Sequence, residues 1–249
     1  SRVTIKHFLA VQKAMQTIFS EHSFKNVITY LDDILIMSRT FEEHLELVTK
    51  VLNTLIKYGT KLNLEKCDFF KQKVTFLGHI ISTDGIQKCP EYIDKIRNYS
   101  KPTTITELRQ FLGLVNFQRK FIRNCSIIAK PLTEKTNGPK RQKLVYTDEM
   151  SEAFDKLKQI LLSDVSLSFP NYTEGAEPLE LYVDASSVGA GACITQKQEG
   201  QYRTIAYAST TFSPAESRYS TIERELNAVR FGLKIFRSFL LGVKFILFT

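Results

Sequence analysis

An adjacent pair of acids, Asp32 and Asp33, stands between two short apolar runs at residues 27–31 and 34–37. Short runs of this composition are typical of buried β-strands, and a tight turn between two such strands presents its residues together. Two carboxylates about 4 Å apart repel each other by about 4 kcal/mol at an effective dielectric of about 20. A bound cation would offset that repulsion, and carboxylate oxygens are ligands that Mg²⁺ prefers. A solvated turn without a ligand is the competing interpretation, because turns favour aspartate.

A second acid, Asp184, lies at the end of an alternating, strand-like segment that begins at Leu179. The order of the predicted elements indicates an α/β arrangement, in which the last strand lies parallel to the first through a right-handed crossover. The elements predicted after Asp184 are strands at residues 190–195 and 201–208, a long helix from near Pro214 and a strand at 244–249.

Two acids of this long helix, Glu223 and Glu225, are candidates to meet Asp184. At about 100° per residue, Glu225 lies about 60° from the centre of the apolar face, and Glu223 lies about 100° away on the other side. An acid at the edge of a packed face can reach the sheet, so Glu225 is the candidate, with an ordinary surface acid as the alternative. The predicted apolar face consists of Ile222, Leu226, Val229, Leu233, Phe236 and Leu240.

The balance of charge favours an anionic partner. The 249 residues carry 34 Lys and Arg against 26 Asp and Glu, a net charge of +8, and nucleic acid is the usual partner of such a chain. The cysteines form no CxxC pair, so we expect reduced thiols of an intracellular protein rather than a zinc site or a disulfide frame. No apolar run reaches about 18 residues, so no membrane span is expected. The four cysteines are Cys67, Cys89, Cys125 and Cys193.

Capping signals mark two further helices. Thr40 and Glu43 form a capping box, and Gly59 is a plausible end for the helix behind it. Thr104 and Glu107 form a second box, and the helix behind it has a basic, amide-rich face. The apolar residues predicted to pack are Phe41, Leu45, Val48, Leu52, Leu55 and Ile56 in the first helix and Ile105, Leu108, Leu112, Val115 and Ile122 in the second.

A second hairpin is predicted from strands at residues 73–81 and 86–88. Gly78 inside the first strand indicates a bulge or a close approach, either by a nucleic-acid strand or by packed side chains. The turn-rich, charged segment 136–143 is the best domain boundary, and an amphipathic helix follows at 149–163. One face of a helix near the start of the chain is formed by Val11, Met15, Ile18 and Phe19.

Three ordered blocks of this sequence resemble parts of one family. The block Tyr30–Asp33, with its flanking apolar runs, is similar to the YxDD hairpin of reverse transcriptases. The block Phe76–Ile86 resembles their primer-grip region, and Leu108–Ile122 resembles their thumb helix. Taken together, the chain is similar to gypsy-type LTR retrotransposon polyproteins, in the part that holds reverse transcriptase and ribonuclease H.

The resemblance implies a multidomain α+β and α/β fold with a truncated ribonuclease H-like mixed sheet and helix at its end. The third carboxylate of each metal site is expected from flanking sequence, so this stretch alone is expected to be inactive. The segment Ser1–Phe8 departs from the family's pattern near the incoming nucleotide. The implied domains are a partial palm at residues 1–89, a helical thumb at 90–138, a linker at 139–148 and the ribonuclease H-like domain at 149–249.

The resemblance also implies two catalytic, metal-binding pairs: Asp32 with Asp33, and Asp184 with Glu225. Lys66 is the implied proton donor to the leaving pyrophosphate, with an ordinary surface lysine as the alternative. The implied nucleic-acid contacts are Tyr30, Leu77, Gly78, His79, Arg109, Gln110, Asn116 and Arg119.

The implied chemistry is phosphoryl transfer with two Mg²⁺ ions at each site, with Mn²⁺ as an alternative. The implied partners are an RNA template, a DNA primer, their hybrid, deoxynucleoside triphosphates and the rest of the polyprotein, without a membrane. The implied location is cytoplasmic, within virus-like particles, with the nucleus as an alternative. Two competing hypotheses are a decayed or domesticated, non-catalytic remnant that binds nucleic acid, and a metal-free α/β scaffold.

Overall fold

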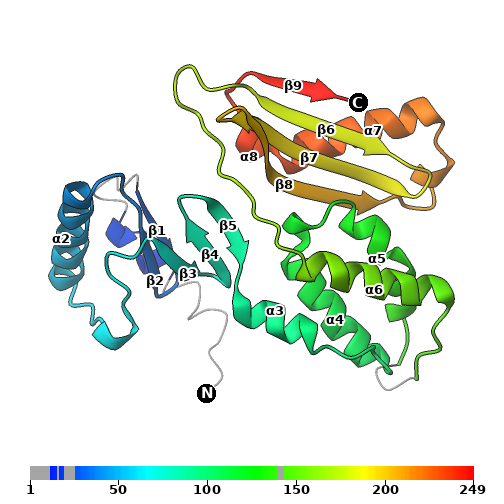
Figure 1. The fold of residues 1–249 in the computed structure, drawn as a ribbon, viewed down its shortest axis with the longest axis horizontal. Helices are drawn as coiled ribbons and strands as arrows, with labels where there is room; N and C mark the ends of the chain where they lie inside the picture. Colours follow the sequence, from blue (N-terminus) through cyan, green and yellow to red (C-terminus); the bar gives the residue numbers. More distant parts are fainter. Residues whose placement is uncertain (1–11, 16, 20–25, 140–142) are drawn as a thin grey trace. The chain divides into compact units, whose positions relative to one another are not determined.

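The computed structural model describes residues 12–15, 17–19, 26–139 and 143–249 (Figure 1). The chain divides into two compact units, one ending at Leu77 and the other starting at Gly78. The palm boundary predicted at residue 89 therefore falls inside the second unit. The segment Ser1–Phe8 lies outside the described residues, as do residues 140–142 of the predicted linker.

The first unit packs a long helix and a short N-terminal helical stretch around a two-stranded hairpin. Met15 and Phe19 are buried with Ile18 packed beside them, which confirms that part of the predicted face, while Val11 lies outside the described residues. The other elements of this unit are β1 (Val27–Tyr30), β2 (Asp33–Ile36), α2 (Phe41–Lys57), the 3₁₀ turn η1 (Leu64–Lys66) and β3 (Lys73–Phe76).

Helix α2 begins and ends as predicted. The Thr40 Oγ1 accepts a hydrogen bond from the Glu43 N–H at 3.2 Å, and Gly59 follows the helix with φ of 65°. The predicted packing face is only partly right, because the buried face is rotated toward Val51, which contacts the hairpin core. Three members of the predicted face are exposed: Phe41, Leu45 and Ile56.

The second unit begins with an antiparallel hairpin of β4 (His79–Ser82) and β5 (Gly85–Lys88). The single strand predicted over residues 73–81 is wrong, because Leu77 and Gly78 have φ of 48° and 73° and separate β3 from β4. Ile86 of β5 exchanges two backbone hydrogen bonds with Leu167, at 2.7 and 2.9 Å. The hairpin is therefore tied to the chain that follows it.

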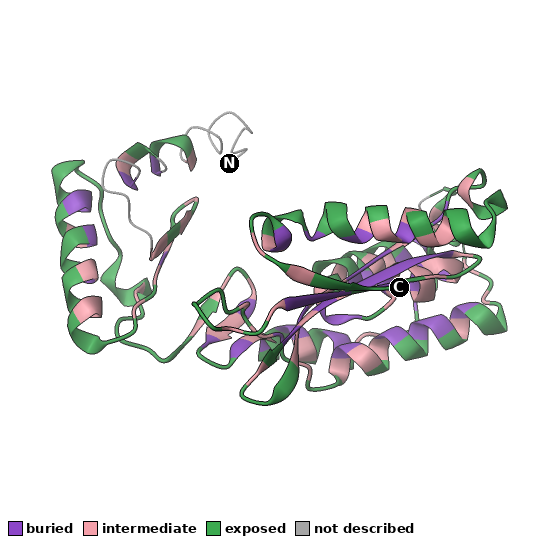
Figure 2. Cartoon of the chain, turned by 90° about the horizontal axis from the view of Figure 1, so that it is seen from above, coloured by how far each residue is buried: buried purple, intermediate pink, exposed green. Residues whose placement is uncertain are grey.

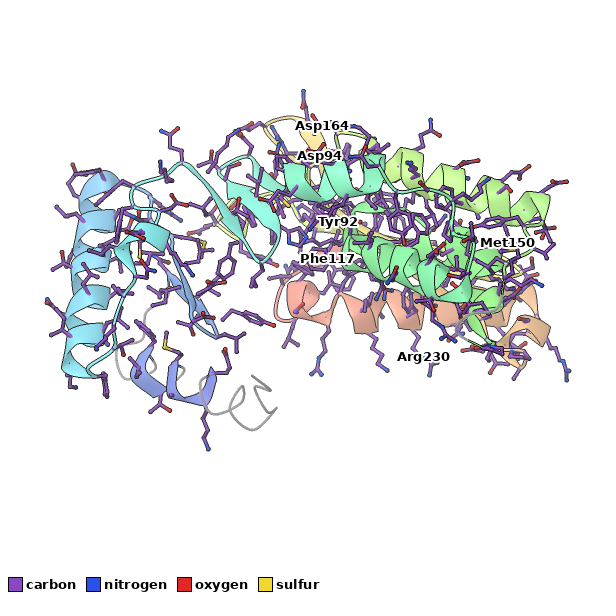
Figure 3. All side chains as sticks on the ribbon, turned by 90° about the horizontal axis from the view of Figure 1, so that it is seen from below. Tyr92, Asp94, Phe117, Met150, Asp164 and Arg230 are labelled. Carbon is purple, nitrogen blue, oxygen red and sulfur yellow. The ribbon has the colours of Figure 1, made fainter. Side chains whose placement is uncertain are left out.

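A helical core comes next. It is formed by four helices, and the rings of Phe111 and Phe154 lie 4.5 Å apart within it. Met150, which Figure 3 labels, is buried in the same core, so its helix packs with the predicted thumb rather than with the later sheet. The elements are α3 (Pro90–Arg97), α4 (Ile105–Phe117), η2 (Arg119–Phe121), α5 (Cys125–Thr133), η3 (Glu134–Thr136) and α6 (Asp148–Leu162).

The helix predicted behind Thr104 is shorter than expected. It ends at Phe117, so Ile122 is buried but lies beyond α4. After η2, Asn124 adopts a left-handed backbone with φ of 56° and redirects the chain into α5. Helix α5 was not predicted, and it contains Pro131, a residue that normally interrupts helices.

The last part of the chain forms a mixed sheet with strand order β8-β7-β6-β9. β9 pairs parallel with β6 and the other pairs are antiparallel, which confirms the predicted α/β order and crossover (Figure 1). The elements are β6 (Leu179–Ala185), β7 (Gly189–Gln198), β8 (Gln201–Thr211), η4 (Glu216–Arg218), α7 (Thr221–Ile235), α8 (Arg237–Leu240) and β9 (Phe245–Phe248).

Helix α7 packs on this sheet through small residues. Ala228 is fully buried, and a Cβ at Gly232 would lie 2.6 Å from the Val183 Cγ1, so the helix backbone approaches β6 closely. The predicted apolar face is wrong at Ile222 and Leu226, which are 73% and 64% exposed. The contact face is the one that carries Ala228 and Gly232, and the outer faces of the helices remain open to solvent (Figure 2).

All four cysteines are free thiols, as predicted. Burial raises the pKa of Cys125 and of Cys193 to about 11, so both thiols are protonated near neutral pH. Within the described residues, no helix combines the length and the apolar character needed to cross a bilayer.

Candidate functional site

The first acid pair lies at the tip of the β1–β2 hairpin, and both carboxylates are exposed. The register pairs Tyr30 with Asp33, so the two turn residues are Leu31 and Asp32, and Asp33 is already the first residue of β2. Neither carboxylate makes a hydrogen bond or an ion pair with any residue that the structure describes. Tyr30, a predicted nucleic-acid contact, is exposed on the same tip.

One side chain from the N-terminal helical stretch holds this turn. The Gln12 Oε1 accepts a hydrogen bond from the Leu31 N–H at 2.6 Å, and its Nε2 donates to the Thr29 carbonyl at 3.4 Å. Leu31 has φ of 57°, a left-handed conformation that costs a residue with a Cβ about 1–2 kcal/mol. Gln12 thus stabilises the turn that directs Asp32. No local sequence pattern marks Gln12 for this role.

A pocket of about 260 Å³ opens beside the acid pair. Its walls come from β2, α2, β3 and the segment 66–71, and Asp32 and Asp33 line it. Lys66 lines the same pocket, so the structure brings the predicted proton donor together with the acids. Lys71, which the sequence analysis did not single out, also lines it. Carboxylates can hold a metal ion, and ammonium groups can bind phosphate oxygens.

The residues predicted as primer grip have mixed environments. Leu77 is exposed, whereas a Cβ at Gly78 would lie 2.9 Å from the Phe117 Cζ, so packing accounts for this glycine. His79 is only 9% exposed, and its ring stacks on Phe117 and Phe121 at centroid distances of 5.2 and 5.9 Å. His79 therefore lies in an aromatic stack (Figure 3 labels Phe117), and its role as a nucleic-acid contact stays a prediction.

Two of the predicted thumb contacts bind backbone carbonyls. The Arg109 Nη2 donates to the Thr136 carbonyl at 2.6 Å, at the end of the helical core. The Arg119 Nη2 donates to the Ser209 carbonyl of β8 at 3.1 Å. Both arginines therefore have structural partners that the sequence did not predict. The remaining two predicted contacts are exposed: Gln110 and Asn116.

In the second acid site, the two helix acids have different environments. The Glu223 Oε2 accepts a hydrogen bond from the Ser220 N–H at 2.8 Å, and the Ser220 Oγ accepts one from the Glu223 N–H at 3.3 Å. These two bonds form a capping box, and they lower the pKa of Glu223. Glu225 is half-buried and forms no hydrogen bond or ion pair within the described part of the chain. Glu225 is therefore the acid left available for a site.

Asp184 and Glu225 stand on opposite sides of β6, near the end of that strand. Glu225 precedes Gly232 by two helical turns, about 10 Å, on the face that contacts Val183. Helix α7 begins at the end of the sheet where β6 ends (Figure 1). Asp184 is the penultimate residue of β6, and strand alternation places it on the opposite face from Val183. The two carboxylates can therefore meet only around the end of the strand.

The donor chemistry of both pairs fits Mg²⁺. In phosphoryl-transfer sites this ion takes one or two carboxylates and fills its remaining positions with water and phosphate oxygens. Each pair offers two carboxylates without a competing protein partner in the described residues. Within those residues, no cluster of three or more His, Cys, Asp and Glu side chains could hold a metal ion.

Polar and charged groups also lie further along the strand that carries Asp184. The Tyr182 hydroxyl donates to the Glu180 Oε2 at 2.6 Å, and this hydrogen bond raises the pKa of Tyr182 to about 12. The positive charge of Arg123 partly offsets the effect of burial on the pKa of Cys193, which pairs with Tyr182 across the sheet. A cation from the helical core therefore lies close to the sheet that carries Asp184.

Two family models match the chain. The model described as "Reverse transcriptase (RNA-dependent DNA polymerase)" matches residues 9–81, which include the β1–β2 hairpin. The model described as "RNase H-like domain found in reverse transcriptase" matches residues 146–247, which include α6, β6, β7, β8, α7 and most of β9.

Curated relatives match over nearly the whole chain. The Retrovirus-related Pol polyproteins from transposons opus and gypsy of Drosophila melanogaster are 36% and 34% identical, each over 93% of this chain. The Transposon Tf2-3 polyprotein of Schizosaccharomyces pombe is 35% identical over 92% of it. The chain spans 24%, 23% and 17% of these three relatives, respectively.

Solved structures of a viral relative share the fold. The foamy viral protease-reverse transcriptase in complex with RNA/DNA hybrid is 26% identical, with a TM-score of 0.83 over 99% of this chain and 33% of that one. The same protein in complex with dsDNA is 27% identical, again with a TM-score of 0.83, over 99% of this chain and 50% of that one.

Proposed function

Because this chain belongs to the gypsy-type retrotransposon polyproteins, as a segment with reverse transcriptase and RNase H-like regions, we propose that it forms part of an RNA-copying enzyme. That enzyme would copy RNA into DNA at the first acid pair and degrade the RNA of the hybrid at the second. Its substrates would be an RNA template, a DNA primer, their hybrid and deoxynucleoside triphosphates.

The observation that carries this proposal is the state of the hairpin tip. Asp32 and Asp33 are exposed and have no partner among the described residues, and Gln12 holds Leu31, the turn residue before them, in a left-handed conformation. Uncompensated neighbouring carboxylates are costly unless a ligand uses them. The adjoining pocket also presents Lys66, which a solvated structural turn would not require.

At the first site, Asp32 and Asp33 would hold Mg²⁺, and Gln12 would keep the turn in place while a primer approaches. The metal, when bound, supplies charge stabilisation for the attacking hydroxyl and the leaving pyrophosphate. Lys66, on the wall of the same pocket, would offer a proton to the leaving group. Tyr30, exposed beside the acids, would pack against the template and primer.

At the second site, Asp184 and Glu225 would hold metal at the end of β6 and direct it at the RNA strand of the hybrid. The capping box keeps Glu223 away from this role. Gln110 and Asn116 would face the duplex backbone, where hydrogen bonds to phosphates position a duplex without reading its sequence.

The test uses the longer polyprotein segment that surrounds this chain, because its relatives are several times longer. We expect Mg²⁺-dependent primer extension that Asp32→Asn reduces by at least about a hundredfold, and hybrid cleavage that Asp184→Asn removes while extension continues. Asp94→Asn, at an exposed acid that pairs with Arg97, is the matched control and should leave both activities unchanged.

Extension at the wild-type rate by the Asp32→Asn variant would contradict the first assignment. Hybrid binding that weakens steeply with salt, without turnover in the wild-type segment, would favour the non-catalytic remnant instead.

A further inference from the structure

Three residues form a lateral row across the sheet. Asp184 of β6 pairs with Gly191 of β7, and Gly191 pairs with Ser209 of β8. Side chains of residues that pair directly on neighbouring strands stand on the same face of a sheet. Val183, beside Asp184, contacts Gly232 of α7, so the row stands on the face opposite α7.

Residues of η2 and of the first turn of α5 cover the Ser209 end of this row. The Ser126 N–H donates to the Ser209 Oγ, and the Ser126 hydroxyl donates to the Ser209 carbonyl, each at 2.8 Å. Arg119 donates to the same carbonyl at 3.1 Å. Ser209 is only 2% exposed, so water competes little for these bonds. They fix the start of α5 on the sheet.

Asn124 fills the place of the side chain that Gly191 lacks. A Cβ at Gly191 would lie 2.1 Å from the Asn124 Oδ1, 3.2 Å from its Cγ and 3.8 Å from its Nδ2, so the whole amide lies over Gly191. Asn124 has φ of 56°, which Asn, Asp and Gly adopt more readily than other residues. Its amide makes no hydrogen bond with any residue that the structure describes. The Asn124 amide, which comes from the helical part of the chain, thus lies beside the row that contains Asp184 and is able to donate a hydrogen bond.

We propose that Asn124 is a positioning residue for Asp184, supplied by the helical part of the chain rather than by the sheet. This inference rests on the proposed role of Asp184 as a metal ligand. A carboxylate that binds metal through one oxygen is commonly held by a hydrogen bond to the other, and the Asn124 amide carries a suitable donor. The Ser209 contacts keep that amide in place.

Terbium(III), which binds carboxylates and luminesces when a nearby tyrosine is excited, tests the proposal without requiring activity. The chain has no tryptophan, and Tyr182 stands on the same face of β6 as Asp184. A background of Asp32→Asn and Asp33→Asn removes the first acid pair, and Asp184→Asn in that background measures the signal that belongs to the second site. We expect Asn124→Gly, which suits φ of 56°, to weaken terbium binding about tenfold.

A substitution on the sheet should displace the same amide and so provides an independent test. Gly191→Ala places a methyl group where the Asn124 amide lies, so it should displace the amide and weaken terbium binding about as much as Asn124→Gly. The double variant should bind no more weakly than either single one, because the amide can be lost only once. Gly113→Ala, at a glycine with open space around it, is the matched control.

Unchanged terbium affinity in Asn124→Gly, or additive losses in the double variant, would overturn the positioning role. Asp184→Asn separates this failure from failure of the proposed function. If Asp184→Asn abolishes binding while Asn124→Gly does not affect it, only the positioning role is lost. If Asp184→Asn binds terbium as tightly as the parent, Asp184 is no metal ligand, and both proposals are wrong at this site.

Discussion

Gln118 and Gln196 are buried to the same extent, with 0% and 1% of their surfaces exposed, yet their amides differ. The Gln196 Nε2 donates to the carbonyls of Asn171 and Glu177, both at 2.7 Å, and its Oε1 accepts from the Asn171 N–H at 2.7 Å. Neither amide atom of Gln118 has a hydrogen-bond partner among the described residues. Burying a polar group without a partner costs about 1–3 kcal/mol.

Replacing each glutamine with methionine, which has a similar shape, should therefore have opposite effects. We expect Gln118→Met to leave the free energy of unfolding unchanged or to raise it by about 1 kcal/mol, because an unsatisfied amide is removed. We expect Gln196→Met to lower it by about 3 kcal/mol, because three backbone groups lose their partner. Urea unfolding of both variants measures this difference, and equal losses would contradict it.

Among single residues, the candidate acids could be predicted from the sequence, but their neighbours Gln12 and Asn124 could not. Asp32, Asp33 and Asp184 follow strand-like runs, which is a local pattern that the sequence displays. Gln12 and Asn124 act on segments 19 and 67 positions away, at Leu31 and Gly191, and no periodicity marks such contacts. Their role depends on the folded arrangement.

Among helices, two glycines that look alike in the sequence have opposite surroundings. Gly113 of α4 has nothing within 4 Å of an added Cβ, whereas a Cβ at Gly232 of α7 would meet the Val183 Cγ1 at 2.6 Å. We expect Gly113→Ala to stabilise the chain by about 0.5–1 kcal/mol, the gain in helix propensity. Gly232→Ala should destabilise it by about 1–3 kcal/mol through overpacking. Thermal unfolding with matched buffers measures both effects.

Stabilisation by Gly232→Ala would show that α7 can move away from β6 at little cost, against the close packing described above. The same contact explains why the apolar face predicted for α7 was wrong. Periodicity counts large apolar residues, but exposed apolar residues are common on protein surfaces. Here Ala228 and Gly232 form the contact, and Ile222 and Leu226 remain exposed.

The second unit contains two hydrophobic cores whose buried residues run from Cys89 to Leu240, and the Ser209 hydrogen bonds join them. We therefore expect residues 78–249 to fold without the first unit and to unfold in one cooperative transition. Circular dichroism and urea unfolding of that shorter chain measure this. An unfolded or aggregated product would contradict the division at Leu77.

A chain that starts at Pro90 is the matched comparison, because it lacks β4 and β5 but keeps every buried residue of the two cores except Cys89. In the longer chain, the buried Lys88 Nζ donates to the carbonyls of Ile160, Leu161 and Ser163 at 3.4, 2.9 and 2.5 Å. The three carbonyls lie at the C-terminal end of α6. Losing their hydrogen bonds from Lys88 should lower the free energy of unfolding by about 2–4 kcal/mol. Equal stability of the two chains would show that the hairpin contributes nothing.

The order of folds along the chain was predictable from the sequence, because strand and helix patterns follow one another in a family-like order. The packing of α6 with the earlier helices could not be predicted, because its apolar face could pack either on those helices or on the later sheet. A domain boundary depends on which hydrophobic core the apolar face of a helix packs into, and tertiary contacts determine that choice.

The parallel pairing of β6 with β9 joins Leu179 to Phe245, 66 positions later in the chain. A ribosome adds about 5–20 residues per second, so β6 waits roughly 3–13 s before its neighbour is even synthesised. Until then one side of the strand displays bare amide and carbonyl groups, which readily recruit strands from other nascent chains. Crowded polysomes should therefore be where this molecule is most prone to aggregate.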